Sequence, residues 1–234
     1  MPYSIRDLIS NRQRDILWQV VESYIETGEP VASQAIANKL SVSSATIRND
    51  FIALDELNLT ISPHTSSGRI PTHQAFKFYI EKIREHQTSL PQRFQQRLEN
   101  SYKASHNEGE TLRNLAKQIS DIVQSAVAIN MDQDIIFITG LSYIFGQPEF
   151  SSPAEILNVS RAIDELDNNF HKILAEIRPN GELEILIGID NPFGAAFGTV
   201  ILPLESHLFT ILGPARMKYD RAVSCLNFVN ELYN

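Results

Sequence analysis

The sequence predicts an α+β protein in two parts, an N-terminal winged helix-turn-helix followed by a shortened α+β domain. Three observations lead to this fold class. Residues 1–86 show helical periodicity interrupted by Gly and Pro, two short β-rich runs enclose a polar loop near residue 65, and strand-like runs alternate with helical ones after residue 110. With 234 residues and 43% hydrophobic side chains, the composition excludes collagen-like, low-complexity and wholly disordered classes.

The first part should begin with a long helix and a short one. Ser10 and Gln13 have the spacing of a capping box, and the apolar positions that follow give one buried face. Gly28 and Pro30 should end this helix. A short helix capped by Ser33 is expected next.

A third helix is predicted at about Ser44–Leu57, after the turn Ser41-Val42-Ser43. This layout is typical of a helix-turn-helix. Ile47, Phe51 and Leu54 share one side and should pack against the other helices. The opposite side carries Ala45, Arg48, Asn49 and Ile52.

Two short strands after the third helix should form a hairpin, the wing. Leu59-Thr60-Ile61 and Arg69-Ile70 are β-rich and enclose the polar loop 62–68. Thr72 should then cap a helix that runs to about Glu85.

A polar, Pro-terminated stretch from His86 to Pro91 predicts a boundary between the two parts. We expect a winged helix at 1–86, a linker and helical segment at 87–110, and an α+β domain at 111–234. Helices are predicted at 92–104, 110–125, 153–177 and 219–232, and strands at 126–131, 135–139, 183–189, 197–204 and 208–212.

The formal net charge of −8, taken alone, argues against a nucleic-acid partner, because Lys and Arg support phosphate binding. The acidity belongs mainly to the second part. Residues 1–86 carry 9 Lys and Arg against 10 Asp and Glu, whereas residues 87–234 carry 11 against 18. Within the first part, residues 30–49 and 57–80 contain cations but no acid, so these two stretches could face an anionic surface.

The outward side of the third helix has the residue types that read DNA. The major groove admits a helix, and there Arg suits guanine, Asn suits adenine, and hydroxyls suit bases or phosphates. In the wing, Gly68 should allow the tight turn and Arg69 can reach a phosphate or a minor groove. The candidate DNA-binding residues are Ser43, Ser44, Ala45, Thr46, Arg48 and Asn49 of the helix and His64, Thr65, Ser66, Ser67, Gly68 and Arg69 of the wing.

These candidates also have structural interpretations. Arg48 could pair with Asp55 or Glu56 as a surface ion pair, and Asn49 could belong to a cap or a local network. Residue spacing by itself leaves these alternatives open.

No catalytic or metal-binding constellation is visible in the sequence. His64 and His73 have neither a neighbouring Cys nor a His partner at i, i+4, and Cys225 should be a buried, inert thiol. We therefore expect no enzyme activity, no metal and no cofactor. With no long apolar stretch and no signal-peptide core, we expect a cytoplasmic protein without a membrane partner.

Three runs of the first part carry a family resemblance: RQRDILWQVVESYIETGEPVASQAIA, SSATIRNDFIALDELNL and PHTSSGRIPTHQAFKFYIE. Together they resemble the DNA-binding domain of the HrcA family of heat-inducible transcription repressors. In the second part, GQPEF at Gly146–Phe150, IGIDN at Ile187–Asn191 and LGPARMKY at Leu212–Tyr219 are similar to later motifs of that family. The chain is shorter than typical members, because SAVAINMDQDIIFITG is followed almost directly by SYIFGQPEF where they carry a long intervening stretch.

The resemblance implies a homodimer that binds an inverted-repeat operator, called CIRCE, upstream of chaperone operons and represses them until heat stress. It also implies a response to the chaperonin GroEL. The second part would be GAF-like, would serve in dimerisation and regulation, and would lack the family's usual insertion. By carry-over, the outward face of the third helix and the PHTSSGRIPT wing would contact DNA.

Two other functions stay open on the sequence. The second part could bind a small molecule that gates DNA binding, or the winged helix could have lost DNA binding and dock a protein partner. The acid-free stretches argue against the second alternative.

Overall fold

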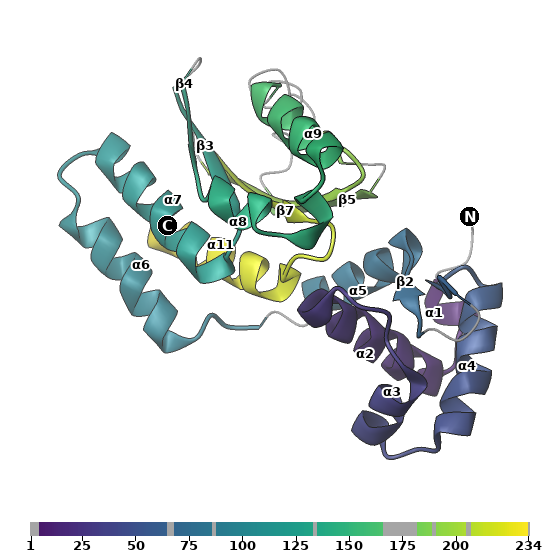
Figure 1. Ribbon diagram of the computed structural model, residues 1–234. Coiled ribbons are helices and arrows are strands. Elements are labelled where there is room, and N and C mark those ends of the chain that lie inside the picture. Colours follow the sequence, from purple (N-terminus) through teal and green to yellow (C-terminus); the bar gives the residue numbers. More distant parts are fainter. Residues whose placement is uncertain are drawn as a thin grey trace. The chain divides into compact units, whose positions relative to one another are not determined.

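The computed structural model describes residues 5–64, 68–85, 88–132, 135–165, 182–188, 191–204 and 207–233. The chain divides into two compact units, Met1–His86 and Gln87–Asn234, which Figure 1 shows in sequence colours. Each unit is described by itself.

The first unit has the element order of a winged helix-turn-helix. The three helices, the hairpin and the further helix that the sequence predicted are present, and a helix of four residues, α1, which was not predicted, precedes them. The elements are α1 (Ile5–Leu8), α2 (Asn11–Thr27), α3 (Ser33–Leu40), α4 (Ser44–Glu56), β1 (Thr60–Ile61), β2 (Ile70–Pro71) and α5 (His73–Glu85).

The helix ends of this unit follow local sequence signals with one exception. The capping box of Ser10 and Gln13 is present, and Gly28 ends α2 in the left-handed conformation with φ of 69°. The prediction that Ser33 caps α3 is wrong, because the cap position is Ala32, whose side chain cannot accept a hydrogen bond. The Ser33 hydroxyl instead hydrogen-bonds the hydroxyl of Ser44 at 2.9 Å, which ties the start of α3 to the start of α4.

An aromatic seam between α2 and α5 forms part of the first core. The rings of Trp18 and Tyr79 lie 4.4 Å apart between centroids, and those of Tyr24 and Phe76 lie 6.4 Å apart. Five residues of the predicted buried face of α2 are buried, and the sixth, Tyr24, is only partly buried. The buried ones are Ile16, Leu17, Val20, Val21 and Ile25.

The second unit is an α+β domain with a five-stranded sheet, which agrees with the GAF-like fold that the resemblance implied. Its described elements are α6 (Gln92–Ala104), α7 (Glu108–Val123), β3 (Ala126–Asp132), β4 (Ile135–Thr139), α8 (Leu141–Phe145), η1 (Pro148–Phe150), α9 (Pro153–Asp164), β5 (Glu184–Ile187), β6 (Phe197–Leu204), β7 (His207–Pro214) and α11 (Tyr219–Tyr233).

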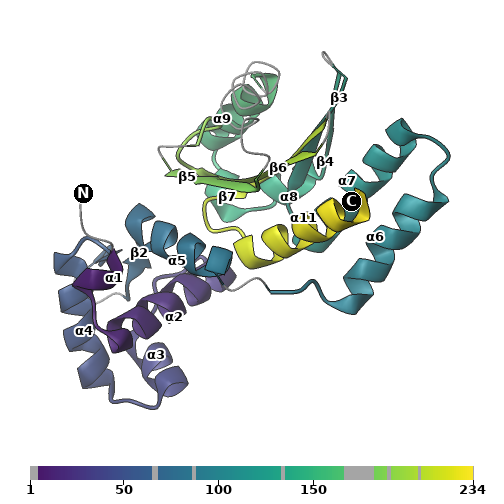
Figure 2. The same cartoon turned by 180° about the vertical axis from the view of Figure 1, so that it is seen from behind.

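The sheet is antiparallel throughout, with the strand order β4-β3-β7-β6-β5. Figures 1 and 2 show α9 on one face and α7 and α11 on the other. The central strand β7 is buried along its whole length, because helices cover both of its faces.

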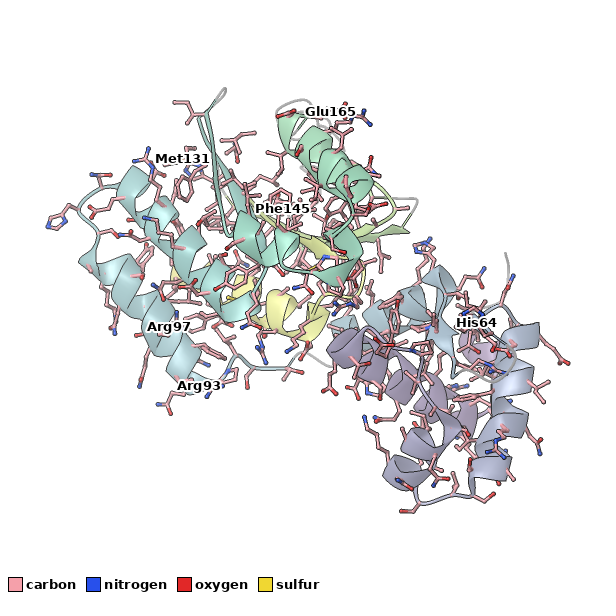
Figure 3. The ribbon with its side chains drawn as sticks, viewed as in Figure 1. His64, Arg93, Arg97, Met131, Phe145 and Glu165 are labelled. Carbon is pink, nitrogen blue, oxygen red and sulfur yellow. The ribbon has the colours of Figure 1, made fainter. Side chains whose placement is uncertain are left out.

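The face beneath α8 and α9 is filled by apolar side chains. Phe150 and Phe197 stack with centroids 5.0 Å apart, and Val159 and Ala162 of α9 pack into the same cluster. On the opposite side of β6, Tyr219 occupies the space beside Gly198, where a Cβ would lie 2.1 Å from the tyrosine oxygen. Outside the sheet, Arg97 of α6, labelled in Figure 3, donates to Gln118 of α7 at 3.0 Å.

Two predicted boundaries differ from the structure. The division between residues 110 and 111 falls inside α7, which is one continuous helix and packs against both α6 and β3. The helical segment and the sheet therefore belong to one unit. The helix predicted at 153–177 is described only to Asp164, and residues 166–181 lie outside the described residues.

Cys225 should not react with thiol reagents while the protein is folded. The side chain is fully buried on α11, and burial raises the pKa of its thiol to about 12. At pH 8 roughly one thiol in ten thousand would be ionised, so labelling should be negligible until denaturant is added. A colorimetric disulfide reagent measures this directly, with the unfolded chain as the control. Full labelling of the folded protein within minutes would contradict the buried placement.

Candidate nucleic-acid interface

The second helix of the helix-turn-helix, α4, buries one side and exposes the other. Ile47, Phe51 and Leu54 are buried, as their spacing predicted. The exposed side carries Ala45, Arg48, Asn49 and Ile52, again as predicted.

Hydroxyl groups hold the N-terminal end of α4 in place. Ser43 is the cap residue, and its oxygen accepts a hydrogen bond from the Thr46 backbone N–H at 3.0 Å. The two side-chain oxygens of Ser43 and Thr46 also lie 2.8 Å apart. Three of the predicted contact residues, Ser43, Ser44 and Thr46, thus already position the helix.

The side chains of Arg48 and Asn49 have no hydrogen-bond or ion-pair partner among the described residues. The alternative in which Arg48 pairs with Asp55 or Glu56 is therefore not what the structure shows. These acids are seven and eight residues further on, about two helical turns away, whereas side chains meet at spacings of three or four. The guanidinium and the amide remain available to a ligand on the exposed side.

Two carboxylates of α4 are held by arginines from other elements. Arg12 of α2 donates to both oxygens of Asp50, at 2.9 and 3.1 Å, and this buried carboxylate raises the pKa of Arg12. At the other end of the helix, the Nε of Arg69 lies 2.7 Å from Oδ2 of Asp55, and Thr60 donates to Oδ1 at 2.6 Å. Neither acid presents a free negative charge beside Arg48.

The wing is anchored by backbone pairing as well as by Arg69. The strands β1 and β2 pair Ile61 with Ile70, and Val31 adds a bridge to Arg69 with both hydrogen bonds at 2.9 Å. The Arg69 side chain is 18% exposed, and its guanidinium carbon lies 5.5 Å from the ring centroid of Phe51. A phosphate contact by Arg69 stays a prediction, but its charge already faces a carboxylate.

Gly68 lies where the wing passes very close to the segment after α2, and its predicted part in the turn stays a prediction. A Cβ at this position would lie 2.4 Å from the carbonyl carbon and oxygen of Val31. Glycine is required because the wing passes directly over the backbone of Val31.

The tip of the wing is only partly described. His64 is exposed, and Figure 3 labels it in the first unit. The Ser62 hydroxyl donates to the His64 carbonyl at 2.6 Å and shapes the loop before the tip. Thr65, Ser66 and Ser67 lie outside the described residues, so their predicted contacts stay predictions.

The two arginine–carboxylate pairs were not predicted from the sequence. Arg12 and Asp50 are 38 residues apart, and Arg69 and Asp55 are 14 apart, so neither pair has a local spacing signal. The acids Asp50 and Asp55 on a helix otherwise suited to DNA could have indicated that they are paired with cations from other elements.

The described part of the chain contains neither a candidate metal site nor a candidate membrane span. No group of three or more His, Cys, Asp or Glu could hold a metal ion there. Within the same residues, no helix is long and apolar enough to cross a membrane.

Comparison with known proteins gives matches across both units. The family description "HrcA protein C terminal domain" matches residues 35–223. Proteins named "Heat-inducible transcription repressor HrcA" from Thermobifida fusca and Carboxydothermus hydrogenoformans are 44% identical over 80 residues and 33% identical over 145 residues. The matches cover 33% and 60% of this chain but 23% and 42% of those proteins, so the chain spans less than half the length of these relatives.

A solved structure described only as that of a hypothetical protein has a similar fold. It aligns with 96% of this chain and 97% of its own, with a TM-score of 0.77 and 17% sequence identity. This likeness concerns the fold alone.

Replacing Asp55 with Ala should lower the free energy of unfolding of the first unit by about 2 kcal/mol, because Arg69 would lose a charged hydrogen-bond partner in a largely covered site. Urea unfolding followed by the fluorescence of Trp18, the single tryptophan, measures this. Glu56→Ala is the matched control, since Glu56 is exposed and adjacent, and should change stability by less than about 0.5 kcal/mol. Equal effects of the two substitutions would show that Asp55 does not stabilise the wing.

Gly68→Ala should destabilise the first unit by about 1–3 kcal/mol, because the new methyl group would overlap the Val31 backbone. The same fluorescence measurement applies. The control is Gly109→Ala in α7, where the added Cβ would lie 3.4 Å from the end of Met131, an ordinary contact. An unchanged unfolding midpoint for Gly68→Ala would mean that the wing does not need its close approach to Val31.

Proposed function

The chain belongs to the HrcA family, and on that premise we propose that it is a transcription repressor that binds an inverted-repeat operator of the CIRCE type through its first unit. The relatives it matches are transcription repressors, which is not an enzyme class. Repression would follow from occupying promoter DNA, and heat stress would relieve it.

One observation carries this proposal. Arg48 and Asn49 lie side by side on the exposed face of α4 and have no partner among the described residues, while both acids nearest to them on the helix are paired. Arg and Asn are the side chains that read guanine and adenine bidentately in the major groove.

The other predicted residues divide into contacting and positioning groups. We propose that Ala45, Arg48 and Asn49 face base edges, and that Ser43, Ser44 and Thr46 contact phosphates near the N-terminus of α4. The wing residues from His64 to Ser67 would track the backbone of the DNA. Gly68 and Arg69 would hold the wing against α4 and Val31.

A two-fold operator favours a two-fold protein. An inverted repeat presents two equivalent half-sites, and a homodimer with one winged helix per half-site matches that symmetry. We propose that the second unit, α+β and GAF-like, forms the dimer. Modulation by the chaperonin GroEL is included in the proposal on the strength of the family resemblance.

The test of this function is a fluorescence-anisotropy titration of the full chain. The two probes are a CIRCE-type inverted-repeat duplex and a scrambled duplex of equal composition, at one stated near-physiological salt concentration. Binding to the repeat that is at least a hundredfold tighter is expected, since specific sites typically exceed non-specific ones by roughly a thousandfold or more. Equal, weak binding to both probes would overturn the proposal.

Arg48→Ala should lose about 1–3 kcal/mol of affinity for the repeat and little for the scrambled duplex, because a bidentate base contact carries specificity. Arg161→Ala on α9 is the matched control, with the same change of charge at an exposed position of the second unit. An unaltered preference for the repeat in Arg48→Ala would exclude base readout by this residue. The same titrations measure both variants.

A further inference from the structure

We infer that Ile52 is a specificity-determining residue of the α4 face, where it would pack against the 5-methyl group of one thymine in each half-site. This inference rests on the proposed function. It adds a large apolar contact to a surface whose other proposed readers are the small side chain of Ala45 and the polar side chains of Arg48 and Asn49.

Ile52 is the exposed large apolar side chain of α4. Its side chain is 53% exposed, whereas the three other large apolar side chains of α4, Ile47, Phe51 and Leu54, are 3% exposed or less. Burial therefore does not account for an isoleucine at this position. Helix propensity does not account for it either, because β-branched side chains are restricted in a helix.

Ile52 lies in line with the proposed readers. It follows Asn49 by three residues and Arg48 by four, so the three side chains share one face of α4. With Ala45 they have offsets of zero, three, four and seven, and at 100° per residue they fall within an arc of about 100°. These are the offsets at which the recognition helix of homeodomains reaches base edges in the major groove.

The charges along the helix limit the contacting stretch to the part that ends at Ile52. Asp50 and Asp55 are paired with arginines, but Glu56, one turn beyond Ile52, is exposed and has no partner among the described residues. A carboxylate there would be repelled by phosphates. Ile52 is thus the last exposed position of this face before an unfavourable charge.

The chemistry of the major groove fits an apolar side chain at this point. Thymine is the base that presents a methyl group there, and apolar side chains recognise it by contact. Burying one methyl group corresponds to about a fourfold change in affinity. A symmetric dimer would make the contact twice, which gives roughly a fifteenfold change for a repeat altered in both half-sites.

The test uses deoxyuridine, which pairs like thymidine but lacks the methyl group. Thymines of the CIRCE-type duplex are replaced at symmetric positions, one pair at a time, and each duplex is titrated with the full-length wild type, Ile52→Ala and Leu8→Ala. Leu8 on α1 is the control, because it is a comparably exposed apolar residue outside α4. Trp18 fluorescence in urea verifies that each variant is folded as stably as the wild type.

One replaced pair should weaken binding of the wild type and of Leu8→Ala by roughly fifteenfold and should leave the affinity of Ile52→Ala unchanged. Two results overturn the inference while the proposed function stands: no replacement affects the wild type, or Ile52→Ala keeps the full effect, although both proteins prefer the repeat to a scrambled duplex. If the wild type does not distinguish the repeat from the scrambled duplex, the proposed function fails and the inference fails with it.

Discussion

The neutralisation of two carboxylates on α4 is the constraint on which the candidate interface depends. A helix that faces DNA phosphates cannot present free acids beside its basic side chain, yet α4 contains Asp50 and Asp55. Arg12 from α2 and Arg69 from the wing neutralise these two carboxylates through close, charged hydrogen bonds. The Arg12–Asp50 pair also joins α4 to α2, and the Arg69–Asp55 pair joins the wing to α4. The same two ion pairs therefore determine both the charge and the geometry of the candidate interface.

Arg69 binds Asp55 of α4, and this ion pair holds the wing in place more firmly than pairing between two-residue strands could by itself. The base of the wing is held by the backbone bridge to Val31, by the close passage of Gly68, and by the Asp55 carboxylate that Thr60 also binds. Small isolated hairpins are only marginally stable in water, so these anchors from α4 and from the segment after α2 are what give the wing a defined place.

The second unit has a five-stranded antiparallel sheet whose central strand is covered on both faces. Phenylalanine side chains fill the face under α9, and Arg216 fastens the loop after β7 to Gln147 and Glu149 beside η1. Part of the family resemblance lies in these segments, since both GQPEF and LGPARMKY contribute to this contact. The motifs therefore preserve packing in the unit to which the proposal assigns dimerisation.

The sequence by itself determined the longer helices of the first unit, the capping box at Ser10, the wing strands and the outward position of Arg48 and Asn49, because these depend on periodicity and local hydrogen bonds. It did not indicate the short helices α1 and α8. Tertiary structure alone decided that Arg48 has no partner among the described residues, that Arg69 binds Asp55, that Ser33 bonds Ser44 and that Gly68 is needed for a close approach. Each of these involves groups from different elements, whose distances are set by packing and leave no spacing pattern in the chain.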